Sequence, residues 1–267
     1  MTTATLPAQR VTQVRVVGSE WIKLRSLRST VFSLLAAVGI ILGFSVLIPS
    51  VTVTHWPPRD LREALLFDPT TRSLAGVFLA QLAIGSLGVL VMTGEYATGM
   101  IRASFSAVPR RLPVLWAKLA VFATTTLVLT IPSVFAAFLI GQSIFSRKHL
   151  ETSLSHPGVT RAVLGAALYL TVVGLLGVGL GALLRNTAGA ISTLFGLLFV
   201  LPILVHFLPT SWSDPIGKYL PSNAGSAILQ VVPDPSALGP WTGFAVFCGY
   251  AAVAVALAAV VLTRRDA

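Results

Sequence analysis

The chain has 267 residues, of which 55% are hydrophobic and only 10% charged, and its formal net charge is +10. A soluble domain carries about 25% charged residues, so this composition excludes an ordinary soluble domain and indicates that most of the chain lies in lipid. The positive charge would suit nucleic acid. Most basic residues lie beside apolar runs, however, where membrane topology accounts for them. The single cysteine, Cys248, excludes a disulfide framework.

The N-terminal part of the chain precedes the first apolar run. Residues 1–10 are polar, and we expect them to be disordered. Residues 11–30 predict an amphipathic helix, and a basic helix with a tryptophan on its apolar face suits the headgroup region of a membrane. At about 100° per residue, its apolar stripe consists of Val14, Val17, Trp21 and Leu24. A simple cytoplasmic extension of the first span is the alternative.

Six runs without a charged residue are long enough to cross a bilayer, which takes about 17 to 25 residues in a helix. They are 31–48, 73–93, 121–145, 162–184, 187–208 and 241–263. The runs are continuous and do not alternate apolar with polar residues, which favours helices over barrel strands. The sequence therefore predicts an all-α integral membrane protein, with six transmembrane helices in residues 31–267.

The lysines and arginines predict the orientation of these spans, because cytoplasmic loops are enriched in both. If both termini are inside, the cytoplasmic segments contain twelve of the nineteen Lys and Arg residues. We therefore expect a multi-pass protein of the plasma membrane with both termini in the cytoplasm. Segment 94–118 then lies in the cytoplasm, and segment 209–240 lies outside.

Segment 94–118 is polar and carries helix signals. Thr98 can cap a short helix over residues 99–107, and Pro109 ends it. Ile101, Phe105 and Val108 form its apolar stripe. The alternative interpretation is that these charges serve only to fix the topology.

Glu95 lies at the C-terminal end of the second span. A carboxylate is unfavourable at a helix C-terminus. We therefore expect Glu95 to pair with a basic residue or with the start of the following helix.

The outside segment 209–240 contains "LPSNAGSAILQVV", residues 220–232, which predicts a short helix capped by Ser222 or Asn223. It is apolar enough to dip into the outer leaflet as a re-entrant segment, which is allowed where protein buries it. A surface loop is the alternative, and the sequence does not distinguish the two.

Two pairs of glycines have the G-x-x-x-G spacing that lets helices approach closely: Gly39 with Gly43, and Gly177 with Gly181. Gly177, Gly179 and Ala182 also match a dinucleotide-binding pattern. That pattern needs a preceding strand and an acidic residue about 20 positions on, and here it lies inside an uncharged helix. We expect helix packing at these positions.

Several kinds of chemistry have no residues to carry them. No histidine has a nucleophile or a metal-ligand pattern beside it, and the phosphate-binding pattern G-x-x-x-x-G-K-[ST] does not occur. The absence of charged residues from the spans argues against an ion-coupled secondary transporter. We expect no enzyme activity and no cofactor or metal bound by this chain.

Three stretches together resemble ABC-2 type ABC transporter permeases, in particular the compact actinobacterial kind. They are "SEWIKLRSLRSTVFSLL" (19–35), "EYATGMIRASFSAVPRRLPVLWAKL" (95–119) and "YLPSNAGSAI" (219–228). The resemblance extends over about residues 15–265 and agrees with the predicted spans. It implies a type V exporter-like fold and the membrane subunit of an ATP-binding-cassette exporter.

The resemblance also implies partners and roles. A separate cytoplasmic ATPase would hold ATP and Mg²⁺, and a second permease copy, identical or a close paralogue, would complete the path for a drug, antibiotic, lipid or peptide. The residues that the resemblance implies for coupling to the ATPase are Glu95, Thr98, Gly99, Ile101, Arg102, Phe105, Pro109 and Arg110. Membrane lipid is an expected partner, and nucleic acid is not.

Neutral polar residues in the spans are candidates for lining the path: Gln81, Thr125, Ser133 and Thr193. For each of them, hydrogen bonding to its own helix is the alternative. Two other functions also remain open for the chain as a whole. One is a membrane scaffold or assembly factor that transports nothing, and the other, less favoured, is a secondary transporter.

Overall fold

The structure is a computed structural model that describes residues 12–58, 67–100, 111–232 and 236–264. Within these ranges the regular elements are all helical and no strand occurs. The helices are α1 (Gln13–Ser26), α2 (Arg28–Thr54), α4 (Pro69–Ser73), α5 (Gly76–Ala97), α7 (Arg111–Phe145), α8 (Val159–Leu184), α9 (Thr187–Phe195), α10 (Leu201–His206), α11 (Thr210–Gly217), α12 (Pro221–Ser226) and α13 (Pro240–Arg264). The disorder expected for residues 1–10 concerns a segment outside the described residues.

In the part of the chain that the structure describes, six helical segments are long and apolar enough to cross a membrane, so the predicted number of spans is confirmed. They are α2, α5, α7, α8, α13 and the segment Thr187–His206, which combines α9 with α10. The chain is therefore a multi-pass membrane protein by the length and composition of its helices.

The observed helices extend beyond the uncharged runs. α7 begins at Arg111 and has 35 residues, which is about 52 Å at the helical rise, against a hydrocarbon core of about 30 Å. A search for uncharged runs starts this helix only after Lys118. Lysine is a good helix former, so the helix runs through Lys118, whose ammonium bonds to carboxylates of two other helices.

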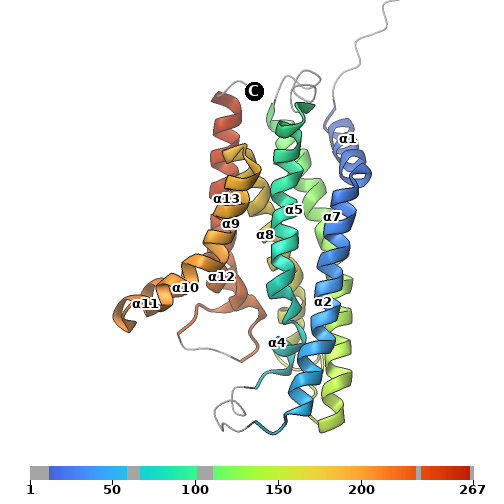
Figure 1. The fold of residues 1–267 in the computed structure, drawn as a ribbon, viewed down its shortest axis with the longest axis vertical. Coiled ribbons are helices and arrows are strands. Elements are labelled where there is room, and N and C mark those ends of the chain that lie inside the picture. The colour runs from blue at the N-terminus through green and yellow to red at the C-terminus, as the bar shows by residue number, and fades with distance from the viewer. Residues whose placement is uncertain (1–11, 59–66, 101–110, 233–235, 265–267) are drawn as a thin grey trace, which may run out of the picture.

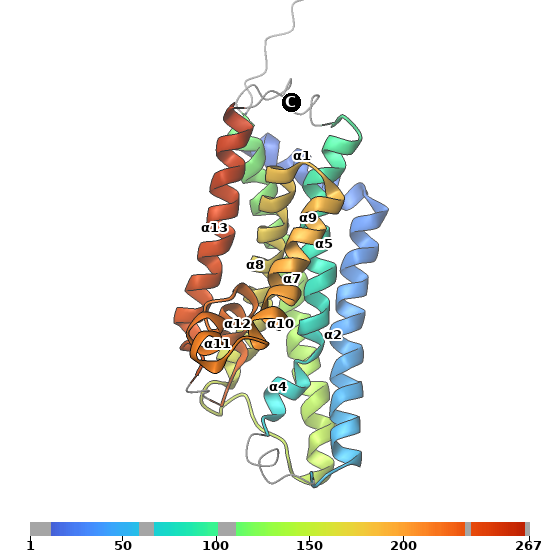
Figure 2. The same cartoon turned by 60° about the vertical axis from the view of Figure 1, so that its left-hand side comes forward.

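The long helices form a bundle around α8 (Figures 1 and 2). α8 is the most buried span, with 83% of its most apolar stretch inside the protein. It packs against α5, α7 and α13. α2 lies outside α5 and α7. α1 and the C-terminal end of α13 lie at the same end of the bundle, called the α1 end below. The two lie at the same end because an even number of spans separates them.

Glycines allow α5 and α8 to pack backbone against backbone. A Cβ atom added at Gly177 would overlap the Gly85 carbonyl oxygen, and one added at Gly181 would lie 2.9 Å from the Val89 carbonyl oxygen. The expected close approach at Gly177 and Gly181 is therefore seen.

The other glycine pair behaves differently. A Cβ atom at Gly39 or Gly43 would meet no atom within 4 Å, so the expected close packing is not seen there within the chain. The physical reason is that this face of α2 is turned away from α5 and α7. Equal spacing in the sequence does not distinguish a face that meets a neighbouring helix from one that meets none.

Residues 220–232 form α12 and a 3-10 turn, Ala227–Leu229, both packed in protein. Ala224 and Ile228 are fully buried, and Gly243 of α13 approaches the Ala224 carbonyl oxygen closely. α12 starts at Pro221 with Leu220 as its N-cap, so neither Ser222 nor Asn223 caps it as expected. Such burial meets the condition under which a non-spanning segment can enter a bilayer.

The fifth span bends away from the bundle. α9 continues through a π-helical turn, Gly196–Val200, into α10, and the arm formed by α9, α10 and α11 leans outward in Figure 1. Pro202, within the first turn of α10, cannot donate the helical hydrogen bond, and π turns and prolines are the usual causes of helix bends.

The glycine contact leads to a stability prediction. Gly177→Leu should destabilise the protein by about 1 to 3 kcal/mol or more, because the side chain would meet α5 backbone that cannot move aside. Gly249→Leu is the matched control, since Gly249 lies exposed in α13 with open space around it. Apparent melting temperatures of the purified variants in detergent provide the comparison. Equal melting temperatures for the two variants would contradict the packing argument.

Candidate functional site

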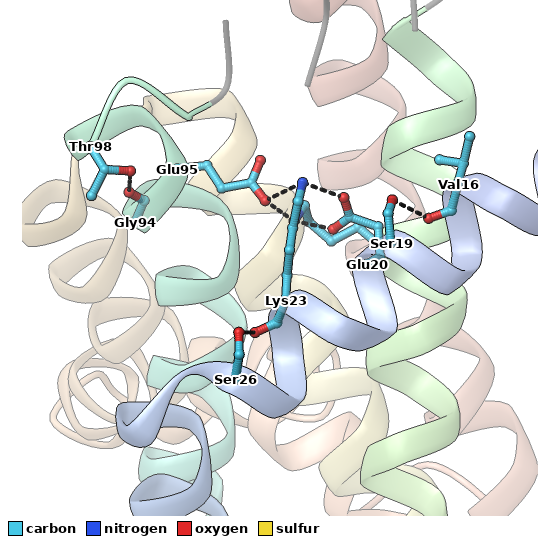
Figure 3. A network of polar contacts seen from close by, with 9 residues as sticks. Val16, Ser19, Glu20, Lys23, Ser26, Gly94, Glu95 and Thr98 are labelled. Atoms are coloured by element: carbon cyan, nitrogen blue, oxygen red, sulfur yellow. Dashed lines mark hydrogen bonds and ion pairs between the residues drawn. The ribbon is translucent and has the colours of Figure 1, made fainter. Parts of the chain in front are cut away.

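Four charged side chains, two acidic and two basic, gather at the α1 end of the bundle. Glu20 and Lys23 come from α1, Glu95 from the last turn of α5, and Lys118 from the N-terminal part of α7. We call these four residues the ion network. Figure 3 shows Glu95 pointing toward the two side chains of α1.

Each lysine in the ion network bonds to both carboxylates. Lys118 Nζ lies 2.6 Å from Glu20 Oε2 and 2.8 Å from Glu95 Oε1. Lys23 Nζ lies 2.7 Å from Glu20 Oε1 and 3.1 Å from Glu95 Oε1. The four formal charges cancel, and the bonds connect three helices that are far apart in the sequence.

Burial makes the ion network energetically important. The Lys118 and Glu20 side chains are only 3% and 4% exposed. A buried charge is costly unless it is paired, and removing one member of a buried pair leaves the other uncompensated. The expected pairing of Glu95 is confirmed, and its partners are Lys23 and Lys118.

The ion network also sets the protonation of Lys23. Burial opposes the charge of this side chain, but the hydrogen bonds and charges of Glu20 and Glu95 outweigh burial and raise its pKa. Because the pKa of Lys23 is raised in the folded protein, charged Lys23 contributes its full stabilisation of the fold at neutral pH. This contribution is lost only as the pH rises above 10.5 and through the folded pKa.

The local sequence explains how α1 reaches the bundle. α1 and α2 are separated by one non-helical residue, Leu27, whose extended backbone (φ −81°, ψ 114°) turns the chain between them. Val16 of α1 packs on Val114 and Ala117 of α7, and Gln13 Nε2 donates to the Pro113 carbonyl oxygen at 3.1 Å. The buried face of α1 thus continues from Val16 toward the ion network.

The predicted apolar stripe of α1 is divided by this packing. Leu24 is buried and Val17 is partly buried, whereas Val14 and Trp21 are 80% and 47% exposed. Two of the four residues thus face away from the protein. They remain available for the membrane surface, as expected of an interfacial helix.

The last turn of α5 contacts other helices besides those of the ion network. Thr187 Oγ1 of α9 donates to Thr93 Oγ1 at 2.9 Å, and the Arg185 guanidinium lies 5.2 Å from the centre of the Tyr96 ring. Arg185 ends α8 in the left-handed conformation, with φ 53°. The end of α5 therefore contacts α1, α7, α8 and α9.

A cavity of about 200 Å³ adjoins the ion network. Its apolar walls include Leu24, Leu90 and Val121, and all four ion-network residues line it. Glu95 Oε2 is buried and has no hydrogen-bond partner among the described residues. The cavity leaves space beside a carboxylate that is only half satisfied.

Only part of the expected coupling site can be located. Ile101, Arg102, Phe105, Pro109 and Arg110 lie outside the described residues, as does most of the short helix expected at 99–107.

The three described members of the expected coupling site lie at the end of α5. Glu95 belongs to the ion network. The Thr98 hydroxyl donates to the Gly94 carbonyl oxygen at 2.9 Å, a bond within the last turn of α5. Gly99 follows with φ +72°, a left-handed conformation that favours glycine after a helix end.

The candidate path-lining residues all make hydrogen bonds within the chain. Gln81 is fully buried and accepts a hydrogen bond from the Tyr169 hydroxyl. The other three donate to carbonyl oxygens of their own helices: Thr125 to Val121, Ser133 to Leu129, and Thr193 to Gly189. Their hydroxyls thus make the backbone bonds that formed the alternative explanation.

The sequence analysis assigned no role to Glu20, Lys23 or Lys118, although all three lie in the stretches that carry the resemblance. The signal in the sequence is Glu95 itself. A carboxylate at a helix end next to apolar spans needs basic partners, and few basic residues lie close enough to reach it. In the described parts of the chain, no group of three or more His, Cys, Asp or Glu side chains is placed to hold a metal ion.

Comparison with known proteins does not identify a family. No protein-family model matches the chain, and a sequence search finds no curated protein that matches it.

Removing one charge from the ion network should destabilise the protein. Lys118→Met leaves two buried carboxylates with one lysine, and the expected loss is about 3 to 5 kcal/mol. Adding Glu20→Gln removes a charge of the opposite sign and should restore more than half of that loss. Chemical unfolding of the purified protein in micelles measures both effects.

Lys148→Met is the matched control for these variants, because Lys148 is an exposed lysine just after the other end of α7. It should change the unfolding free energy by less than about 0.5 kcal/mol. Equal losses for Lys118→Met and Lys148→Met would contradict the role given to the ion network.

Proposed function

We propose that the chain is the permease subunit of an ATP-binding-cassette exporter, which moves an amphipathic or hydrophobic substrate out of the cytoplasm. A separate ATPase subunit hydrolyses ATP. The observation that carries the proposal is the ion network, which fixes α1 to the adjoining ends of α5 and α7. Residues 101–110 connect these same two helices, so a partner that pushes on α1 or on this connection acts on two spans together.

The charge distribution supports a cytoplasmic position for this end. α1 contributes Arg15 and Arg25, α8 ends at Arg185, and the last residue of α13 is Arg264. Basic residues beside spans mark the cytoplasmic side. The α1 end is therefore the side on which we place the ATPase.

Packing supports a route for the motion. α5 and α8 meet through glycine backbones, and we expect them to move as one pair because such close contacts leave little room for sliding. The span Thr187–His206 is only 22% buried, compared with 83% for α8, so it is less restrained by the rest of the chain. Movement of the α5–α8 pair against this span is a rigid-body change of the kind that coupling requires.

The proposal includes a second permease copy. Only 17% of the most apolar stretch of the first span, α2, is buried, and a Cβ atom added at Gly39 or Gly43 would meet no atom of the described residues within 4 Å. The weakly buried faces of α2 and α9 remain for that copy and for lipid. A path between two such copies has an apolar, uncharged lining, which suits an amphipathic or hydrophobic cargo.

The test is purification of the tagged chain from its native membranes in mild detergent, followed by an ATPase assay of the recovered complex. We expect recovery of an ATP-hydrolysing subunit that contains a phosphate-binding loop. Reconstituted vesicles should then show ATP-dependent movement of an amphipathic dye. Recovery of the chain without an ATPase, and vesicles without ATP-dependent export, would favour the scaffold alternative.

A neutral double variant tests the role of the ion network in coupling. Glu20→Gln with Lys118→Met keeps the net charge but loosens α1, and should lower ATP-dependent dye movement at least tenfold while the protein still inserts. Lys148→Met with Glu151→Gln makes the same chemical changes at exposed positions away from the α1 end and should leave transport unchanged. Full transport by the first double variant would exclude the network from coupling.

A further inference from the structure

Two adjoining cavities lie between the α9–α11 arm and the bundle, away from the ion network. Their volumes are about 450 Å³ and 350 Å³, and Pro202, Asn223, Ser226 and Gln230 line both of them. The shared lining residues place the two cavities side by side, and together they are called the joined space below. Its size lies in the range of pockets that bind small molecules, about 300 to 1,000 Å³.

The larger cavity is mainly apolar. Phe78 of α5 and Phe199 of the π-helical turn form one wall, with their rings edge to face at 5.1 Å between centroids. Phe78 and Ile203 are each 58% exposed, so this cavity is bordered by surface that in a spanning protein meets lipid. An acyl chain can enter such a cavity from the side.

The smaller cavity is polar and carries charges of both signs. Asp214 and Lys218 lie in its wall together with His206. Across the described residues, Asp214 receives a hydrogen bond only from Ser213, at 3.3 Å, and no ion pair joins it to Lys218. A carboxylate and an ammonium group therefore face the same space without being paired to each other.

A buried serine borders the apolar cavity. Ser222 lines the apolar cavity and is only 7% exposed, yet its Oγ has no hydrogen-bond partner in the part of the chain that the structure describes. Buried polar groups in folded proteins are nearly always hydrogen-bonded.

Exposed aromatic residues lie next to the polar cavity. Trp212 and Tyr219 are 64% and 48% exposed, and they neighbour Ser213 and Lys218 in the sequence. Tryptophan and tyrosine are enriched at the boundary between lipid tails and headgroups. The polar cavity thus lies at headgroup depth and the apolar one deeper among the tails.

We propose that this joined space binds one zwitterionic phospholipid with an ethanolamine headgroup. Lys218 pairs with the phosphate, Asp214 accepts hydrogen bonds from the primary ammonium, and part of one acyl chain occupies the apolar cavity beside Phe78 and Phe199. A carboxylate favours a primary ammonium over a quaternary one, because only the primary ammonium donates hydrogen bonds. The site does not depend on the proposed transport function.

The experiment counts lipids bound to the delipidated full-length chain by native mass spectrometry in detergent. Dioleoylphosphatidylethanolamine should bind as a single copy, about tenfold more tightly than the choline or glycerol analogues with the same chains. Asp214→Asn and Lys218→Gln should each weaken that binding about tenfold. Asp214 is exposed and Lys218 is half-buried, so the variants should keep the fold.

Lys148→Gln is the matched control, because it removes an exposed lysine outside the cavity. It should leave binding unchanged. Equal or tighter binding of the glycerol lipid, or equal binding by the Asp214→Asn variant, would overturn the proposal.

Discussion

The structure depends most on the pairing of two carboxylates with two ammonium groups where α1 meets the ends of α5 and α7. Lys118 and Glu20 are almost fully buried and are joined at 2.6 Å. Neither charge is tolerated alone in that position, so each fixes the place of the other. α1 is therefore held on the bundle by a geometric requirement, whereas its outer face, with Trp21, remains exposed.

This constraint explains why the end of α5 gathers so many contacts. Glu95 meets α1 and α7, Tyr96 lies under Arg185 at the end of α8, and Thr93 bonds to Thr187 of α9. Along its length, α5 packs backbone against backbone on α8 through glycines. An element that joins four neighbours at one end and packs rigidly along its length is suited to carry a movement applied at that end.

The spans were predictable because uncharged apolar runs of bilayer length are typical of transmembrane helices. The bounds of the spans were less predictable. α7 continues through Lys118, whose charge is paired with another helix, so the end of an uncharged run does not mark the end of the helix. The need of Glu95 for a partner followed from its place at a helix end, but its partners are 72 and 23 residues away in the chain. Likewise, Gly39 and Gly177 share a spacing, and only the tertiary arrangement shows which one meets a neighbour.

The most direct test of the central claim measures how firmly α1 is held. Spin labels at Arg25→Cys and Thr263→Cys, in a Cys248→Ser background, report the distance between exposed positions on α1 and α13. With the ion network intact, electron paramagnetic resonance should give one narrow distance distribution, and Lys118→Met should broaden it. An equally narrow distribution in the Lys118→Met protein would contradict the claim that the network holds α1 in place.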